Sequence, residues 1–352
     1  MLFRRQFSLI HYVLVEQFGL HIAETCNIGL TEVYAGSIVL SNMFSGDLRR
    51  AVLEALSYSD IFEFPLRLEE IHRYLPVRST VEQVADALGK LDGAVDARGG
   101  YFFLSGRAQI VEIRRERELQ SRSLLPSALK YGHFLGSLPF IRMVALTGSL
   151  AVMNVSKDVD FDYMLVTVSG RLWTARAFAL LLNHLTKRIG HTLCPNLIVA
   201  ETALEWPLHD LYSARELYQM IPITGTDVHE KVIAANLWAR EYLPNAYHAL
   251  AHEEKVTPFR KVLELPLRGK IGNRFERWEM TRKIARFSQQ PGFGEETIFN
   301  AKVCQGNFHH HRKWTQEAFE GRLANLAISG AALGGDVLVQ PSRKKEMGAY
   351  KL

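Results

Sequence analysis

Three aspartates occupy alternate positions in a short apolar segment, at Asp158, Asp160 and Asp162. Side chains alternate between the two faces of a strand, so these carboxylates are expected on one face, with Val159 and Phe161 on the other. Like charges this close repel one another, and the arrangement costs stability unless a cation neutralises them. Mg²⁺ prefers carboxylate oxygens and completes its shell with water and substrate phosphate. The pattern therefore predicts a magnesium site.

A phosphate-binding turn is predicted just before this strand. An apolar stretch over 143–146 leads into Thr147, Gly148 and Ser149, after which a short helical segment begins. Glycine lets the backbone approach a ligand closely. Amide groups at the start of a helix favour an anion such as a phosphate. One short segment thus supplies both a phosphate cradle and metal-binding carboxylates.

The spacing of these two features resembles the polymerase-beta-type nucleotidyltransferase superfamily. Gly148-Ser149 is followed by ten residues and then by Asp160-Phe161-Asp162-Tyr163, flanked by apolar strands. The likeness covers residues 140–205. Residues 48–245 also look like a bacterial and archaeal subgroup that places a winged-helix-like segment before such a domain. The resemblance implies an α+β fold with a mixed sheet and flanking helices.

The implied activity is magnesium-dependent transfer of a nucleoside monophosphate from a nucleoside triphosphate to an acceptor hydroxyl. The acceptor is left open among a small molecule, an RNA end and a protein. Two magnesium ions would bridge the nucleotide phosphates and the aspartates, with Asp158 as a further ligand beside Asp160 and Asp162.

The resemblance also assigns residues to the nucleotide. Gly148 and Ser149 would hold the triphosphate. Arg171 and Arg176 open the helix that follows the aspartate strand, where they are candidates for phosphate contacts.

The third carboxylate typical of active members is not evident. The next expected strand, 193–200, carries Asn196 at the inward position, and an amide cannot serve as a base. Glu201 at the strand end, or Asp158, is the candidate replacement. The alternative function is therefore a nucleotide-sensing DNA- or RNA-binding regulator with a catalytically impaired transferase domain.

The region before the transferase core has the element order of a winged helix. Helical patterns over 48–62, 66–75 and 80–91 precede turn signals at Asp92-Gly93 and Gly99-Gly100, which flank a short β-ribbon. The third helix lacks arginine, so a packing role is favoured over nucleic-acid binding through 47–106. The expected units are an N-terminal extension and linker (1–46), the winged-helix-like domain (47–106), a helical connector (107–138), the transferase core (139–205), a helical C-terminal region (206–328) and a flexible tail (329–352).

A second basic segment lies near the C-terminus. Residues 260–286 contain nine basic and three acidic side chains, together with Phe275 and Trp278. A basic helix with aromatic residues is typical of nucleic-acid binding. The alternative is a helix that buries its aromatic rings and solvates its charges.

Composition limits the class of protein. The chain has 352 residues, 47% hydrophobic and 22% charged, which excludes a disordered chain and predicts two or three domains. No apolar run is long enough to span a membrane. Three cysteines are too few for a disulfide framework, which favours a reducing, cytoplasmic location without membrane partners.

Overall fold

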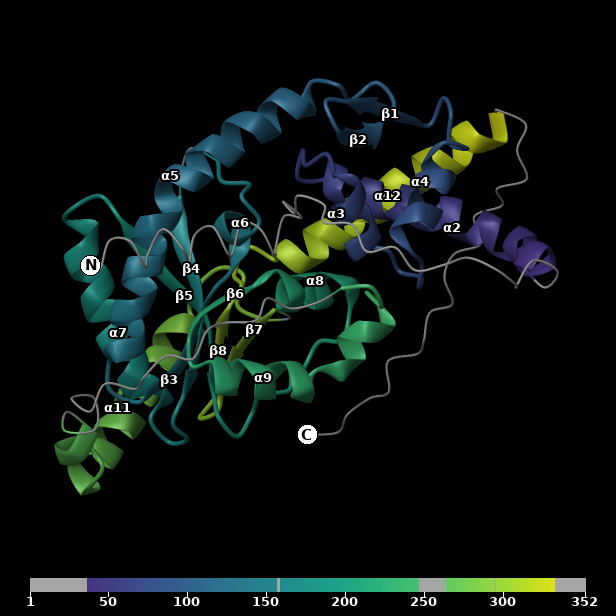
Figure 1. Cartoon of the computed structure of the whole chain (residues 1–352). Helices are drawn as coiled ribbons and strands as arrows, with labels where there is room; N and C mark the ends of the chain where they lie inside the picture. The colour runs from purple at the N-terminus through teal and green to yellow at the C-terminus, as the bar shows by residue number, and fades with distance from the viewer. Residues whose placement is uncertain (1–36, 157–158, 247–261, 263, 295, 333–352) are drawn as a thin grey trace, which may run out of the picture.

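The computed structural model describes residues 37–156, 159–246, 262, 264–294 and 296–332, without the side chains of 37–47 and 327–332. Within these residues the chain forms a mixed sheet flanked by helices and a smaller N-terminal unit (Figure 1). Asp158, the N-terminal residues 1–36 and the tail residues 333–352 lie outside the described residues. None of the described helices combines the length and apolar character needed to cross a bilayer.

The sheet has six strands, and only its central pair is parallel. The parallel strands β4 (Asp160–Thr167) and β5 (Thr192–Ala200) are joined through α7 (Leu172–Lys187), as a parallel connection requires. All other pairings are antiparallel. In spatial order the strands are β6 (Ile221–Thr224), β3 (Ile141–Leu146), β4, β5, β8 (Val303–Gly306) and β7 (Thr297–Phe299). The expected mixed α and β class is thus confirmed.

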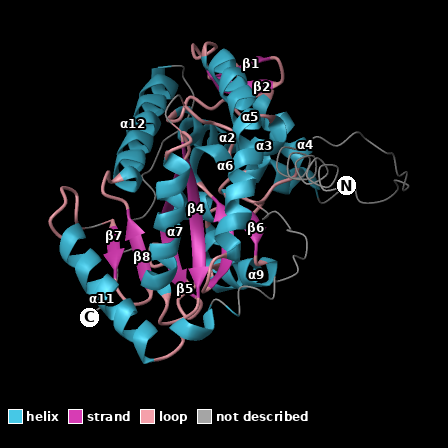
Figure 2. Cartoon of the chain, turned by 90° about the vertical axis from the view of Figure 1, so that its left-hand side faces the viewer, coloured by secondary structure: helices cyan, strands magenta, loops and turns pink. Residues whose placement is uncertain are grey.

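Helices cover both faces of the sheet (Figure 2). On one face α5 (Ile110–Ser137), α7 and α11 (Lys270–Phe287) bury a core that includes Phe161, Tyr163 and Trp173. On the other face α8 (Leu211–Gln219) and α9 (Thr226–Ala235) pack over Met164 and Val166. Because Asp160 and Asp162 alternate with Phe161 and Tyr163, both carboxylates belong to the α8 face. The shorter helices are α6 (Gly148–Ala151), η1 (Leu237–Glu241) and η2 (Leu265–Leu267).

The N-terminal unit contains three helices followed by a two-stranded antiparallel ribbon, in the order expected. Its elements are α2 (Ser37–Asp60), α3 (Leu68–Arg73), α4 (Val81–Leu88), β1 (Val95–Arg98) and β2 (Tyr101–Leu104). Thr80 starts α4 with a reciprocal pair of hydrogen bonds to Gln83. The C-terminal helix α12 (His311–Ala332) packs on α2, so the first and last described helices lie side by side (Figure 1).

Buried cations fix this unit to the rest of the molecule. Arg114 of α5 is fully buried, donates to both carboxylate oxygens of Glu70 at 2.6 and 2.8 Å and stacks on Phe64. Arg215 of α8 lies 4.0 Å from the ring centre of Tyr58 and 4.6 Å from that of Tyr74. Breaking such buried contacts leaves an unpaired charge, which costs several kcal/mol. The unit is therefore held in one position against the sheet.

Two sequence expectations differ from the structure. Residues 36–46 were expected to form a linker, but α2 already begins at Ser37, because the one internal glycine, Gly46, weakens a helix by only about 1 kcal/mol. The expected helical region 206–328 also contains β6, β7 and β8. These strands have only three or four residues each, too few to display the alternation that identifies a strand.

Candidate functional site

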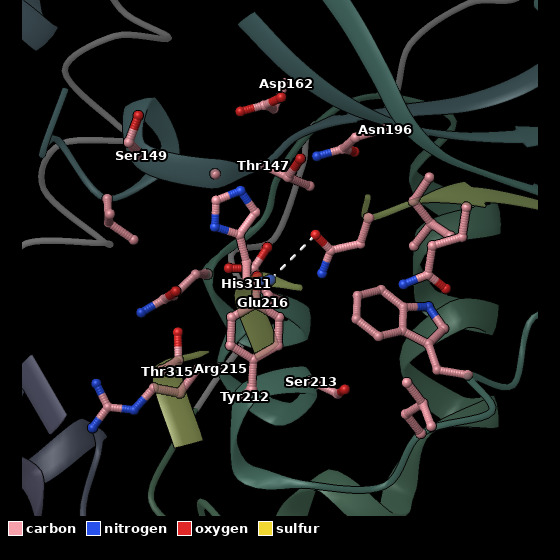
Figure 3. Close-up of a pocket in the computed structure, with 18 of the residues that line it drawn as sticks. Thr147, Ser149, Asp162, Asn196, Tyr212, Ser213, Arg215, Glu216, His311 and Thr315 are labelled. Carbon is pink, nitrogen blue, oxygen red and sulfur yellow. Dashed lines mark hydrogen bonds between the residues drawn. The ribbon is translucent and has the colours of Figure 1, made fainter. Parts of the chain in front are cut away.

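A cavity of about 710 Å³ opens at the end of the sheet where β3 ends and β4 begins. Its size falls within the range of small-molecule sites. The turn at Thr147–Ser149, strands β4 and β5, helix α8, helix α12 and the N-terminal unit all contribute to its walls (Figure 3). The N-terminal unit supplies Tyr58, Phe62 and Phe64. The cavity therefore lies between the six-stranded sheet and the N-terminal unit.

The turn into α6 brings the backbone against the second aspartate. The amide of Thr147 donates to the carbonyl oxygen of Asp162 at 2.9 Å. Gly148 has a φ of +67°, a conformation that disfavours other residues. A Cβ atom at this position would lie 2.5 Å from the Asp162 Oδ2 atom. Glycine is thus required both by the backbone conformation and by the carboxylate beside it.

The two aspartates have unequal surroundings. Both line the cavity, but Asp160 is exposed, whereas Asp162 is partly buried. Figure 3 shows Asp162 near Thr147 and Asn196. Burial, and next the negative charge of Asp160, raise the pKa of Asp162 to about 7. Across the register from Asp162 stands Cys194, whose pKa burial raises to about 12, so this thiol stays neutral. No ion pair to a basic residue of the described chain is found for either aspartate, and the pair suits a cation.

A third carboxylate enters the cavity from α8. Asp210 caps this helix through the amide of Ser213 at 2.8 Å, and the side chains of Tyr212, Glu216 and Gln219 then share its cavity face. Burial, and next the charge of Asp162, raise the pKa of Glu216 to about 7. Sequence reasoning missed Glu216 because the segment shows only a packed helix. The one available signal in the sequence was an acidic residue directly before Leu217, one of the apolar residues that mark this helix.

Asn196 lines the cavity, as its inward position predicted. The β4–β5 register shifts between Tyr163 and Met164, which pair with Pro195 and Leu197, so Asn196 is the extra residue of a bulge. Its amide lies on the same side of the cavity as Asp162 (Figure 3).

Glu201 does not join the aspartates. Asp160 pairs with Thr192 at one end of β5, whereas Glu201 follows Ala200 at the other end and lies beside the amide of Ser169. At about 3.3 Å per residue, the separation along the strand is on the order of 25 Å. Glu201 is therefore removed from the set of candidate catalytic residues.

The two predicted phosphate-binding arginines also lie away from the cavity. Arg171 is buried at the Glu201 end of the sheet and donates to the carbonyl oxygens of Leu267 and Arg268 at 3.1 and 3.0 Å. Arg176 is on α7, which covers the opposite face of the sheet from α8, and its guanidinium lies 5.0 Å from the ring centre of Phe287. Both arginines hold α7 and the segment around α11 together instead of facing the aspartates.

Aromatic and imidazole side chains line the cavity on the side of α12. The rings of Phe62 and Trp314 meet edge to face with centres 6.2 Å apart. His309 and His311 are exposed and their ring centres are 5.8 Å apart, because His310 between them has a φ of +50°. Partial loss of solvent around the ring, and next the neighbouring His309, lower the pKa of His311, which favours the neutral imidazole. This side of the cavity can contact a flat or polar ligand.

Comparison with known proteins adds no assignment: no family model, curated protein or solved structure matches this chain.

Proposed function

We propose that this protein is a magnesium-dependent nucleotidyltransferase. The observation that carries the proposal is the pair of carboxylates on β4 beside the glycine turn that ends β3, at the mouth and inner end of one cavity. The resemblance to the polymerase-beta-type superfamily rests on these same residues. Two acidic side chains that have no basic partner among the described residues, next to a turn that admits no side chain, suit a metal–nucleotide complex better than a purely structural role.

The donor atoms at this point fit magnesium. Asp160 and Asp162 would hold the ion, and no larger cluster of His, Cys, Asp and Glu suited to a metal occurs in the described part of the chain. Two carboxylates suffice, because Mg²⁺ takes its other ligands from water and substrate phosphates. When bound, the ion would supply neutralisation of phosphate charge.

The remaining roles follow from the walls of the cavity. The amides at Gly148 and Ser149, with the exposed Ser149 hydroxyl, are available to the triphosphate. The acceptor oxygen would form a bond to the α-phosphorus, and the bond from that phosphorus to the bridging oxygen would break, releasing pyrophosphate. The N-terminal unit and α12 would exclude water and orient the acceptor.

Thermal unfolding with each nucleoside triphosphate, with and without Mg²⁺, tests the proposal directly. A ligand at about 100 times its dissociation constant stabilises the folded state by about 2.7 kcal/mol. We expect an increase in melting temperature that needs Mg²⁺ and is absent in Asp160→Ala. The absence of an increase with every nucleotide, or an equal one in the variant, would contradict the assigned donor site.

Glu216 is the proposed acceptor of the proton from the attacking hydroxyl. A base with a pKa near 7 is suited to proton transfer at neutral pH. The rate should then rise with pH through about 7, since the carboxyl must lose its proton first. Glu216→Gln should lower kcat about 10²-fold, keep the nucleotide-induced thermal shift and lose this acidic limb.

A matched control for this variant is Glu205→Gln. Glu205 also lines the cavity but is exposed at its outer wall. We expect this variant to keep both the rate and the pH profile. A Glu216→Gln enzyme with an unchanged pH profile would show that another group takes the proton.

The alternative of duplex DNA binding through the N-terminal unit is disfavoured. The exposed charges of α4 are Glu82 and Asp86, and the ammonium of Lys90, just beyond the end of the helix, is paired with Asp86 at 2.6 Å. A helix that reads DNA presents basic or amide side chains to phosphates and bases.

A further inference from the structure

Helix α11 presents charge of one sign to solvent. The three acidic residues of 260–286 are all buried, with exposed fractions of 0% for Glu264, 7% for Glu276 and 3% for Glu279. Glu276 accepts from the amides of Trp173 and Thr174, and Glu264 pairs with Arg142 at 2.7 Å. The acidic side chains thus make their contacts inside the protein and not with solvent. The excess of basic over acidic residues in 260–286 is therefore larger still on the outer face.

The exposed face is correspondingly basic. Its members on α11 are Lys270, Arg274, Arg277, Arg282 and Arg286. Arg282 is paired with Glu279, but no carboxylate of the described chain lies within ion-pair distance of the other four. Four uncompensated cations within 17 residues of one helix make a strongly positive surface.

Apolar side chains run between these cations. Ile271, Phe275 and Trp278 are 77%, 36% and 55% exposed, and their spacing of four and three residues aligns them in one stripe. The rings of Phe275 and Trp278 lie 5.7 Å apart, and the Arg282 guanidinium lies 5.0 Å from the Trp278 ring centre. The expectation that these aromatic rings are buried is wrong: it is the glutamates that face inward.

We propose that this face of α11 binds single-stranded nucleic acid. The uncompensated cations match a chain of phosphates, and arginine forms paired hydrogen bonds with phosphate oxygens. Exposed aromatic rings between the cations give unpaired bases a surface on which to stack. Base pairs in a duplex keep their faces stacked inside the helix, so this surface favours single strands. The proposal is independent of the transferase function, since it uses none of the cavity residues.

An anionic bilayer fits this face of α11 less well than single-stranded nucleic acid does. A helix that lies in a membrane interface has a wide apolar face opposite its charges. On α11 the apolar stripe is one residue wide and has cations on both sides, Arg274 and Arg277 on one and Arg282 and Arg286 on the other. Inserting the stripe into acyl chains would pull these guanidinium groups into the apolar layer.

Fluorescence anisotropy of a labelled 20-nucleotide oligothymidine, titrated with the full-length protein, tests the proposal. Each phosphate contact to a single strand adds about 0.7 to the slope of log K against log salt. With four contacts, affinity should fall about 50-fold between 50 and 200 mM NaCl. In Arg274→Ala/Arg277→Ala the fall should be about sevenfold. Trp278→Ala should weaken binding about tenfold at either salt concentration, since a stacked base is lost.

The matched control is Lys130→Ala/Lys231→Ala, which removes two exposed cations from α5 and α9. It should bind like wild type and, like the α11 variants, keep the wild-type melting temperature. Absence of binding at 50 mM salt, or equal weakening in the α11 and control variants, would overturn the proposal. Flotation with phosphatidylcholine vesicles containing 30% phosphatidylserine completes the test. Binding to vesicles without binding to the oligonucleotide would assign the face to membranes and overturn it as well. Because neither assay contains nucleoside triphosphate or Mg²⁺, failure of this proposal is distinct from failure of the proposed function.

Discussion

Replacing both aspartates of β4, in Asp160→Ala/Asp162→Ala, is expected to lower nucleotidyl transfer by at least about 10³-fold. Removing one preorganised electrostatic contact to a transition state typically costs 10²–10³-fold, and here both carboxylates proposed to hold the metal are lost. The measurement is pyrophosphate release from the nucleoside triphosphate that gives the largest thermal shift, with Mg²⁺. The fold should survive, since one aspartate is exposed and the other is destabilising where it stands.

The control for the double variant is Glu201→Gln. Sequence reasoning made this residue a candidate third carboxylate, but it lies at the opposite end of β5 from the aspartates. The variant should turn over at the wild-type rate. A double aspartate variant that remains active would remove the site assignment, and a slow Glu201→Gln enzyme would show that the far end of the sheet contributes to the reaction.

The strands that carry the site could be predicted from the sequence because their signals are local. Period-two alternation places Asp160 and Asp162 on one face, and the glycine at position 148 marks a turn that only glycine fits. The two apolar strands around them were located within two residues of their bounds. Each of these features depends on fewer than about ten consecutive residues.

Features that depend on topology could not be predicted in the same way. Glu216 lies close enough to feel the charge of Asp162 only because α8 packs on the face of the sheet that carries the aspartates. Arg176 lies on the opposite face of the sheet from the aspartates, and Glu201 lies at the opposite end of β5 from them. The basic outer face of α11 has the same origin: Glu276 turns inward to accept from an amide of α7, and Glu264 turns inward to pair with Arg142 of β3.

Asp162→Asn is expected to stabilise the protein at pH 8 by about 2–4 kcal/mol and to have no effect near pH 4. The carboxyl has its ordinary pKa of 3.8 in the unfolded chain and about 7 in the folded one. The folded state therefore holds the proton more tightly, and its stability falls as pH rises from about 4 to 7. Each unit of difference is worth about 1.36 kcal/mol, which sets the upper end of this range. Replacing the carboxyl group by an uncharged amide removes this loss of stability at high pH.

Denaturant unfolding of wild type and Asp162→Asn at pH 4, 6 and 8 without Mg²⁺ measures this difference. Asp160→Asn is the matched control: the exposed carboxylate is only the secondary cause of the raised pKa, so its removal should stabilise less. At pH 8 Mg²⁺ should stabilise wild type and leave Asp162→Asn nearly unchanged, since the cation and the amide relieve the same repulsion. A variant no more stable than wild type at pH 8 would mean that Asp162 is already neutralised by a group of the chain. The same carboxylate that weakens the fold is the one the proposed reaction needs, and an unfavourable charge retained at the inner end of a cavity is what a binding site for a cation requires.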